Sequence, residues 1–310
     1  MAAKRNAADT AGRRRRFSLL SRQDKIVLGF LIGVPATLHI GLVWVPTVCS
    51  LLLSFTTWNG IGGLDKIKFV GLNNYVNLVT VYPPFWPALE HNLIWLIVFA
   101  FVATPIGIFM AVLLDKDIRG TRFYQSALFL PFVLSLAIIG FIWQLQYAPE
   151  QGVINNVLGR TVQTNEISWL GNPSLNLWAV LVAASWRQIG YVMILYLAGL
   201  KGVDPSLREA AVIDGASELQ AFFRVVLPVM RPVNIVVVVI TIIESLRAFD
   251  IVYVINRGQN GLELLSVLIT ENILGASSRI GFGSAIAVVL LLISLGPILL
   301  FLTRTYEEPS

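Results

Sequence analysis

Two long apolar runs, residues 177–200 and 229–255, each carry a charged side chain near the middle. Arg187 lies in the first run and Glu244 in the second. An ionisable group at the centre of a bilayer costs several kcal/mol unless it is paired or hydrated. The two charges therefore predict either an ion pair that joins two helices or a contact with a polar solute.

Hydrogen-bonding and aromatic side chains accompany these two charges. Gln188 and Tyr191 are three residues apart, so they share one face of a helix. Amides and hydroxyls beside flat aromatic rings suit a sugar, which offers hydroxyls for hydrogen bonds and C–H faces for stacking. The predicted substrate-binding residues are Trp186, Arg187, Gln188, Tyr191, Thr241, Glu244 and Ser245.

A polar segment, residues 204–228, separates the two apolar runs and has the signals of two short helices. Pro205 suits a first helical turn, and Ser206 followed by Glu209 is a capping-box pattern. Gly215 can end this helix in a left-handed conformation, which other residues resist.

The second short helix starts with the same kind of signal. Ser217 and Gln220 repeat the capping box. Small side chains at Ala210, Ala211 and Ala216 allow another backbone to approach closely. The segment therefore predicts either a docking surface or an ordinary ordered loop between two membrane helices.

The composition is that of a membrane protein. Hydrophobic residues make up 56% of the chain and charged residues 13%, against roughly a quarter charged in a typical soluble domain. The mean hydropathy is +0.74. A bilayer core of about 30 Å needs ~20 apolar residues per helix. Six runs meet this length, at 26–56, 91–114, 123–147, 177–200, 229–255 and 280–303.

The positive charges predict how these spans are oriented. With the N-terminus inside, most of the 23 Lys and Arg residues fall in inner segments, few fall in outer segments, and Arg187 and Arg247 fall within spans. The positive-inside rule then places both termini and the segment 204–228 in the cytoplasm. The basic run Arg13–Arg16 beside a first span favours orientation or contact with anionic lipid over nucleic-acid binding.

Several kinds of chemistry are not supported by the sequence. It has no Gly-x-x-x-x-Gly-Lys-Ser/Thr phosphate loop, so any ATP must be hydrolysed by another subunit. Neither of its two histidines, His39 and His91, belongs to a His-Glu-x-x-His zinc motif, and no metal or cofactor site is predicted. The single cysteine, Cys49, excludes an intrachain disulfide.

The order of residues in the polar segment resembles the coupling loop of ABC-importer permeases. Its fixed elements are Glu209-Ala210-Ala211, then Gly215, then Val225-x-Leu227-Pro228. In that family this loop docks in a cleft of the cytoplasmic ATPase. The resemblance implies contact with an ATPase for Glu209, Ala210, Ala211, Asp214, Gly215, Leu227 and Pro228.

Other landmarks extend the resemblance along the chain. Ser54-Phe55 and Trp58 end the first run, and Phe69–Tyr75 reads FVGLNNY, similar to a segment of maltose-type and glycerol-phosphate-type permeases. One departure lies after the fifth run. The family usually continues TxGGP there, whereas residues 256–261 read NRGQNG, so this outer loop is expected to be reshaped.

The resemblance implies an all-α polytopic membrane protein with six transmembrane helices, the type I ABC importer permease fold and a cytoplasmic coupling helix. The expected organisation is a basic cytoplasmic segment (1–25), a permease domain (26–305) with the coupling loop 204–228, and a cytoplasmic tail (306–310). The implied function is half of the pathway for a sugar or oligosaccharide in the cell membrane of a bacterium. The implied partners are a second homologous permease, two ATPase subunits that bind ATP and Mg, and an extracellular solute-binding protein.

Three alternatives stay open. The solute could be a glycerol phosphate or another small polar molecule, since Arg187 could hold an anion. An ion-driven secondary transporter would show inverted repeats and broken mid-membrane helices, and we expect neither. An intramembrane hydrolase would need a nucleophile and a base at matched depth. Ser54, Ser135 or Ser185 with His39 is conceivable, although no recognisable motif accompanies them.

Overall fold

The computed structural model describes residues 21–116, 118–160, 165–276 and 278–307. The basic run at 13–16 and the last three residues of the predicted tail lie outside these ranges. The chain divides into two compact units, residues 1–52 and 53–310. The described part of the first unit is one long helical stretch. It consists of α2 (Arg22–His39), a wide π-type segment (Ile40–Trp44) and α3 (Val45–Leu53), whose last residue belongs to the second unit.

The regular secondary structure of the described residues in the second unit is helical, apart from an isolated β-bridge between Thr56 and Phe69. The helices up to the coupling segment are α4 (Asn73–Thr80), α5 (Phe85–Val98), η3 (Phe99–Ala103), α6 (Thr104–Asp115), α7 (Thr121–Val133), α8 (Leu136–Gln146), α9 (Val153–Val157) and α10 (Pro173–Lys201). The remaining helices are α11 (Pro205–Ile213), α12 (Glu218–Ala221), η5 (Phe222–Val226), α13 (Leu227–Val229), α14 (Arg231–Leu246), α15 (Asp250–Asn256), α16 (Leu265–Leu274) and α17 (Ile280–Glu307).

These helices account for the predicted spans. Four continuous stretches are long and apolar enough to cross a membrane: Arg22–Leu53, Phe85–Asp115, Pro173–Lys201 and Ile280–Phe301. Two bent pairs also qualify: Thr121–Val133 with Leu136–Gln146, and Glu218–Val229 with Arg231–Asn256. If each bent pair crosses once, the described chain has the six spans that the sequence predicts.

The expectation of unbroken spans is wrong at two places. The third span bends by 101° between α7 and α8. Pro131 lies inside α7, and the Ser135 hydroxyl accepts a hydrogen bond from the Ile138 N–H and so starts α8 as a new helix. The fifth span is interrupted as well, because α14 ends at Leu246 and α15 begins only at Asp250.

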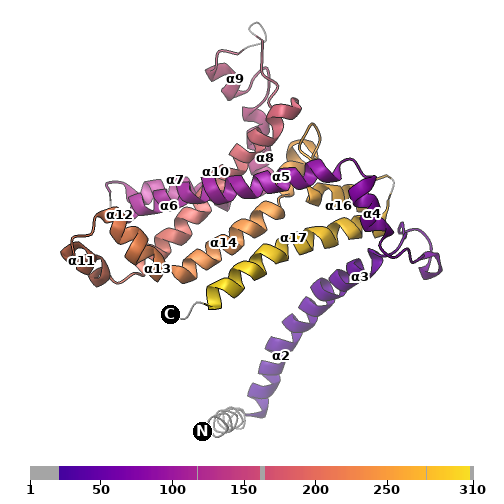
Figure 1. Ribbon diagram of the computed structural model, residues 1–310, viewed down its shortest axis with the longest axis horizontal. Helices are drawn as coiled ribbons and strands as arrows, with labels where there is room; N and C mark the ends of the chain where they lie inside the picture. Colours follow the sequence, from indigo (N-terminus) through magenta and orange to yellow (C-terminus); the bar gives the residue numbers. More distant parts are fainter. Residues whose placement is uncertain (1–20, 117, 161–164, 277, 308–310) are drawn as a thin grey trace. The chain divides into compact units, whose positions relative to one another are not determined.

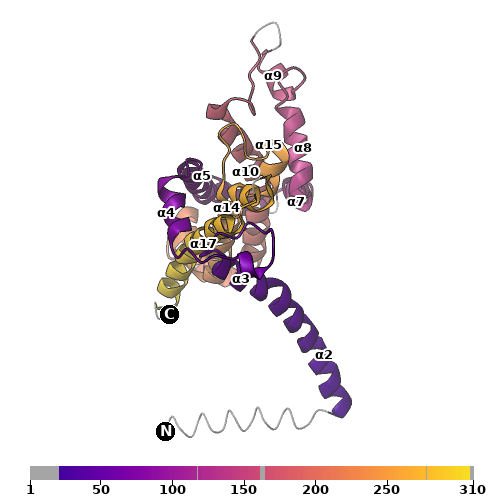
Figure 2. The same ribbon diagram turned by 90° about the vertical axis from the view of Figure 1, so that its right-hand side faces the viewer.

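The core of the second unit forms where α6 packs along α10. Gly107 of α6 makes this close approach possible, since a Cβ atom there would lie 2.9 Å from the Ile189 carbonyl oxygen and 2.8 Å from Val192. In Figure 1, α5, α6, α10, α14 and α17 run side by side, with α11–α13 at one end and α4 and α16 at the other. Figure 2 shows α8 leading away from this bundle, with α9 at its far end.

Candidate functional site

The two charges that the sequence places in mid-membrane form an ion pair. Arg187 of α10 donates from Nη1 to Glu244 Oε2 of α14 at 3.0 Å. The Arg187 side chain is 16% exposed and that of Glu244 is 33% exposed. Both side chains line a cavity of about 200 Å³. The pair is therefore partly open to a space that can hold a solute.

Residues from five helices and one helix break surround this cavity. The α5 stretch contributes aromatic rings, and the break between α14 and α15 contributes two further charges. The lining residues are Trp95, Phe99, Leu136, Ala184, Arg187, Glu244, Arg247, Ala248, Phe249, Asp250 and Ile251. Aromatic faces beside groups that donate and accept hydrogen bonds make the cavity suitable for a polar organic molecule.

Stacked rings hold the Arg187 guanidinium from a second side. Its central carbon lies 4.7 Å from the centre of the Phe132 ring. Phe132 in turn stacks on Tyr191, with ring centres 4.2 Å apart and planes inclined by 2°. The Phe132 ring thus joins the third and fourth spans and fixes the orientation of the arginine through a cation–π contact.

The other predicted substrate-binding residues lie outside the cavity lining. Trp186 makes an edge contact with Trp143 at 5.9 Å between ring centres. Gln188 is 1% exposed, and neither atom of its amide has a partner in the described chain. Thr241 lies 3.3 Å from the Thr104 hydroxyl. Ser245 donates to the carbonyl of a residue in its own helix, Ile242.

Arg247 and Asp250 are not among the predicted substrate-binding residues. Both line the cavity, and neither forms an ion pair with another residue of the described ranges. They flank the break that separates α14 from α15. Two further charges within a predicted apolar span are the signal that could have identified them.

The coupling segment folds as two helices joined at a glycine. Gly215 has φ +79° and, as predicted, ends α11 in the left-handed conformation. The Gly215 N–H donates to the Val212 carbonyl at 3.0 Å, and the Ala216 N–H donates to the Ala211 carbonyl at 2.9 Å. These two bonds are the pattern of a Schellman motif, which satisfies the last carbonyls of a helix.

The two caps differ in how well they were predicted. The second capping box is confirmed, because Ser217 and Gln220 exchange hydrogen bonds at 2.9 and 3.3 Å. The first is wrong: Asp204 caps α11 by accepting a 2.9 Å bond from the Ser206 N–H, so Ser206 lies inside the helix. Hydrogen bonds from the Ser206 backbone and hydroxyl lower the pKa of the Asp204 carboxyl.

Charged side chains attach both short helices to the C-terminal end of α6. Asp115 accepts from Arg208 Nη1 of α11 at 2.7 Å, and its other oxygen lies 3.6 Å from Lys201 Nζ. The neighbouring Lys116 contacts Glu218 of α12 at 2.6 Å. Because the Asp115 side chain is only 11% exposed, its ion pairs are screened less than surface pairs.

The segment exposes large apolar side chains beside its charged ones. Val212, Ile213, Leu219 and Phe223 are 64%, 84%, 71% and 60% exposed. Among the residues predicted to contact an ATPase, Ala211 is buried and Leu227 is partly buried. The exposed ones are Glu209, Ala210, Asp214, Gly215 and Pro228. An apolar surface of this kind beyond the end of membrane helices is typical of a protein contact.

Comparison with known proteins identifies the chain. The family described as "binding-protein-dependent transport system inner membrane component" matches residues 65–308. The chain belongs to this family. It is the membrane-spanning permease subunit of an ABC importer, and ATP hydrolysis lies with a separate subunit.

Relatives of known name cover nearly the whole permease. The xylose/arabinose import permease protein XacH of Haloferax volcanii is 31% identical, over 89% of this chain and 87% of its own. The arabinooligosaccharides transport permease AraP of Halalkalibacterium halodurans is 32% identical, over 90% of this chain and 87% of its own. A crystal structure of a bacterial ABC transporter that imports alginate has the same fold, with a TM-score of 0.76, 20% identity, and coverage of 93% and 98%.

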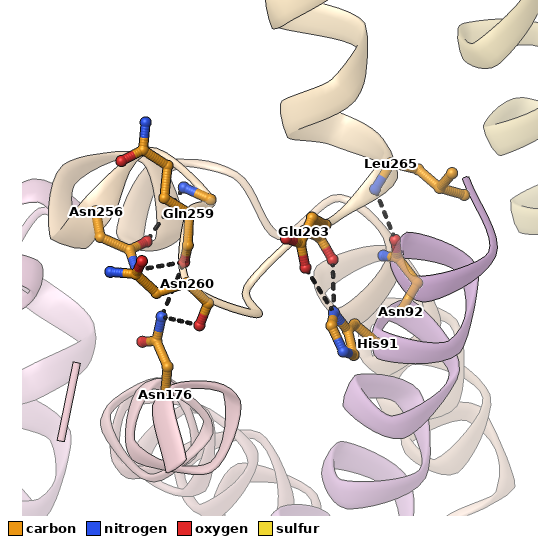
Figure 3. Close-up of polar contacts among 9 residues, drawn as sticks. His91, Asn92, Asn176, Asn256, Gln259, Asn260, Glu263 and Leu265 are labelled. Atoms are coloured by element: carbon orange, nitrogen blue, oxygen red, sulfur yellow. Dashed lines mark hydrogen bonds and ion pairs between the residues drawn. The ribbon is translucent and has the colours of Figure 1, made fainter. Parts of the chain in front are cut away.

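Buried amides hold the loop 256–261 and the chain that follows it, as Figure 3 shows. Asn176 of α10 donates to the carbonyls of Gln259 and Asn260, both at 3.0 Å. His91 Nδ1 lies 2.9 Å from the Glu263 carbonyl oxygen, and Asn92 accepts from the backbone of the residue that starts α16. The loop is thus bound to α10, and the chain between it and α16 is bound to α5.

Proposed function

We propose that this permease forms half of the translocation pathway for a sugar or oligosaccharide, and that a second, homologous permease forms the other half. The observation that carries the proposal is the cavity around Arg187 and Glu244, where aromatic rings lie beside hydrogen-bonding groups. Sugars are recognised by this combination of side chains. The relatives named for xylose, arabinose and arabinooligosaccharides support the same substrate class.

The coupling segment is proposed to dock on one of two ATPase subunits. Support comes from its exposed apolar surface, from the Schellman turn at Gly215 and from the ion pairs of Asp115 and Lys116. Glu209, Ala210 and Asp214 are the exposed polar or small residues that we assign to this contact. Nucleotide and Mg bind to the partner in this proposal, and the permease itself needs no cofactor.

The orientation in the inner membrane is also a proposal. The coupling segment carries Arg208 and Arg224, Lys116 follows α6, and Lys201 is the last residue of α10. This asymmetry favours cytoplasmic termini under the positive-inside rule. The opposite ends of the spans, near α4 and α16, then face the solute-binding protein that delivers the substrate. A structure of the alginate importer was solved with its periplasmic binding protein, which supports this arrangement.

A second candidate substrate is a small polar solute other than a free sugar. A permease of Synechocystis named for uptake of osmoprotective compounds is 33% identical over 80% of this chain. The unpaired Arg247 beside Arg187 could also hold an anionic group such as a phosphate. Glycerol phosphate therefore belongs in any substrate screen.

Uptake in a deletion strain tests the substrate class. Cells lacking this permease are supplied with radiolabelled xylose, arabinose, arabinotriose, maltose or glycerol 3-phosphate. We expect uptake of at least one saccharide to fall to background and to return when the gene is restored. Loss of glycerol 3-phosphate uptake alone would contradict the assignment to sugars.

A further inference from the structure

A second, larger cavity lies at the end of the bundle opposite the coupling segment. Its volume is about 370 Å³, and α4, the start of α17 and the chain after α3 enclose it. Figure 1 shows α4 and the first turns of α17 at this end, far from α11 and α12. The lining side chains that matter here are Thr57, Trp58, Asn77, Tyr82, Arg279 and Phe282.

Buried hydrogen bonds build the wall of this cavity. Asn74 of α4 donates from Nδ2 to the carbonyls of Ser54 and Thr56 at 2.7 and 2.8 Å. The Tyr75 hydroxyl donates to the Ser54 hydroxyl at 2.7 Å. These contacts join the chain after α3 to the FVGLNNY segment, so the cavity is part of the fixed structure of the unit.

Among the described residues of the lining, Arg279 is the only cation, and none of the described carboxylates holds it in place. Its Nη2 donates to Asn272 Oδ1 at 2.7 Å. Its guanidinium carbon lies 5.1 Å from the ring centre of Phe282 and 5.8 Å from that of Tyr82. No carboxylate in the described ranges forms an ion pair with it. The remaining N–H groups are free to bind an anionic oxygen in the bidentate manner typical of arginine.

The cavity lies at the level where apolar spans end. Arg279 immediately precedes Ile280, the first residue of an apolar span, and Trp58 follows five residues after the last residue of another. On α4, Val76 and Val79 are 54% and 46% exposed. Tryptophan, tyrosine and exposed aliphatic side chains at a span end are typical of the headgroup region of a bilayer.

We propose that this cavity binds the phosphate of a glycerophospholipid from the leaflet opposite the coupling segment. Arg279 supplies the positive charge for the phosphate. The Asn77 amide and the Thr57 hydroxyl are the further donors in the lining, and the rings of Trp58 and Tyr82 flank the glycerol. Such a lipid fixes α4 and α17 to one another at the membrane surface.

Lipid retention by the purified importer complex tests this proposal. The complex is exchanged into detergent with added palmitoyl-oleoyl phosphatidylglycerol, and bound lipid is counted by native mass spectrometry. We expect Arg279→Gln to lower the fraction with bound lipid at least fivefold. The control, Arg257→Gln, removes the same charge from an exposed position in the outer loop and is expected to retain the lipid. Equal retention in both variants overturns the proposal.

A second variant keeps the proposal testable if Arg279→Gln fails to fold. Asn77 is exposed on α4, so Asn77→Asp preserves shape and adds a negative charge to the cavity. We expect it to repel the phosphate and lower lipid retention as Arg279→Gln does. Unchanged retention in this variant contradicts the assigned position of the phosphate.

Soluble competitors decide between a lipid and a free phosphate. The same complex is titrated with glycerol 3-phosphate and with inorganic phosphate during the lipid exchange. If neither compound displaces phosphatidylglycerol at millimolar concentration, the result supports a lipid site. If one of the two compounds displaces the lipid at micromolar concentration, the lipid assignment is overturned in favour of a soluble phosphate ligand.

Discussion

Replacing Gly215 by valine tests whether the shape of the coupling segment matters. A Cβ atom at this position meets nothing within 4 Å, so the substitution causes no steric clash with neighbouring residues. Its cost comes from the backbone alone, because φ is +79° and a β-branched residue resists that conformation. Such strain is worth about 1–3 kcal/mol.

The strain acts on two specific hydrogen bonds. The Gly215 and Ala216 N–H groups donate to the carbonyls of Val212 and Ala211 in the Schellman turn. At about 2 kcal/mol, the equilibrium for opening this turn shifts roughly 30-fold, since 1.36 kcal/mol is a factor of ten. We expect faster hydrogen exchange at Ala216, normal membrane insertion, and a fall of at least fivefold in ATP hydrolysis by the assembled importer.

Gly215→Asn is the matched control, because asparagine tolerates the left-handed region better than other side chains. In this variant, hydrogen exchange at Ala216 and ATP hydrolysis by the assembled importer should stay close to the wild-type rates. If Gly215→Val takes up substrate at the normal rate, the assignment of this segment as the coupling element fails. If Ala216 exchange is unchanged in that variant, the argument from backbone strain fails.

Four further outcomes are expected. Arg187→Ala should lower the yield of folded permease, because it leaves the partly buried Glu244 carboxylate unpaired at a cost of about 3 kcal/mol. Arg187→Ala with Glu244→Ala should recover part of that yield in size-exclusion chromatography, and no recovery would contradict a structural pair. Asp115→Asn should uncouple ATP hydrolysis from substrate uptake, whereas the control Asp65→Asn should not. An equal ratio of uptake to ATP hydrolysis in the two variants would refute a role for the Asp115 ion pairs. Gln188→Leu should raise the melting temperature in detergent, because it removes a buried amide without partners; a lower melting temperature would show that the amide has a partner. The purified permease alone should hydrolyse no ATP above a detergent blank, and activity that co-purifies with it through every step would contradict the assignment.

The parts of the structure that the sequence could predict depend on local signals. Gly215 and the Ser217 capping box are recognisable because one or two adjacent residues determine the conformation. The Arg187–Glu244 ion pair was one of two predicted alternatives, since opposite charges in antiparallel apolar runs reach the same depth. Contact of that pair with a solute stays a prediction.

The parts that could not be predicted depend on tertiary packing. Thr241 and Ser245 are buried between helices. The neighbouring helices determine which face of α14 is buried, so the sequence of α14 alone did not predict this. The interruption at Arg247 is hidden in a run that is apolar enough to be continuous. The short helix α16 was missed because a helix of ten residues is too short to cross a bilayer.

The helical stretch Phe85–Asp115 reaches every functional region of the bundle. Near its N-terminal end, His91 and Asn92 contact the backbone of Glu263 and Leu265, and in its middle Trp95 and Phe99 line the cavity. Asp115 at its C-terminal end binds Arg208 of the coupling segment. At 1.5 Å per residue, these 31 residues measure about 46 Å.

That stretch therefore links the coupling segment to the cavity through one continuous backbone. A displacement of the coupling segment would reach the stretch through the Asp115–Arg208 ion pair and would then act along the backbone on the cavity lining. The stretch contains one irregular segment, the π-type turn Phe99–Ala103, where wider hydrogen bonds replace the regular ones. Phe99 lines the cavity, so we expect a change of tilt at the Asp115 end to bend the stretch at the cavity wall.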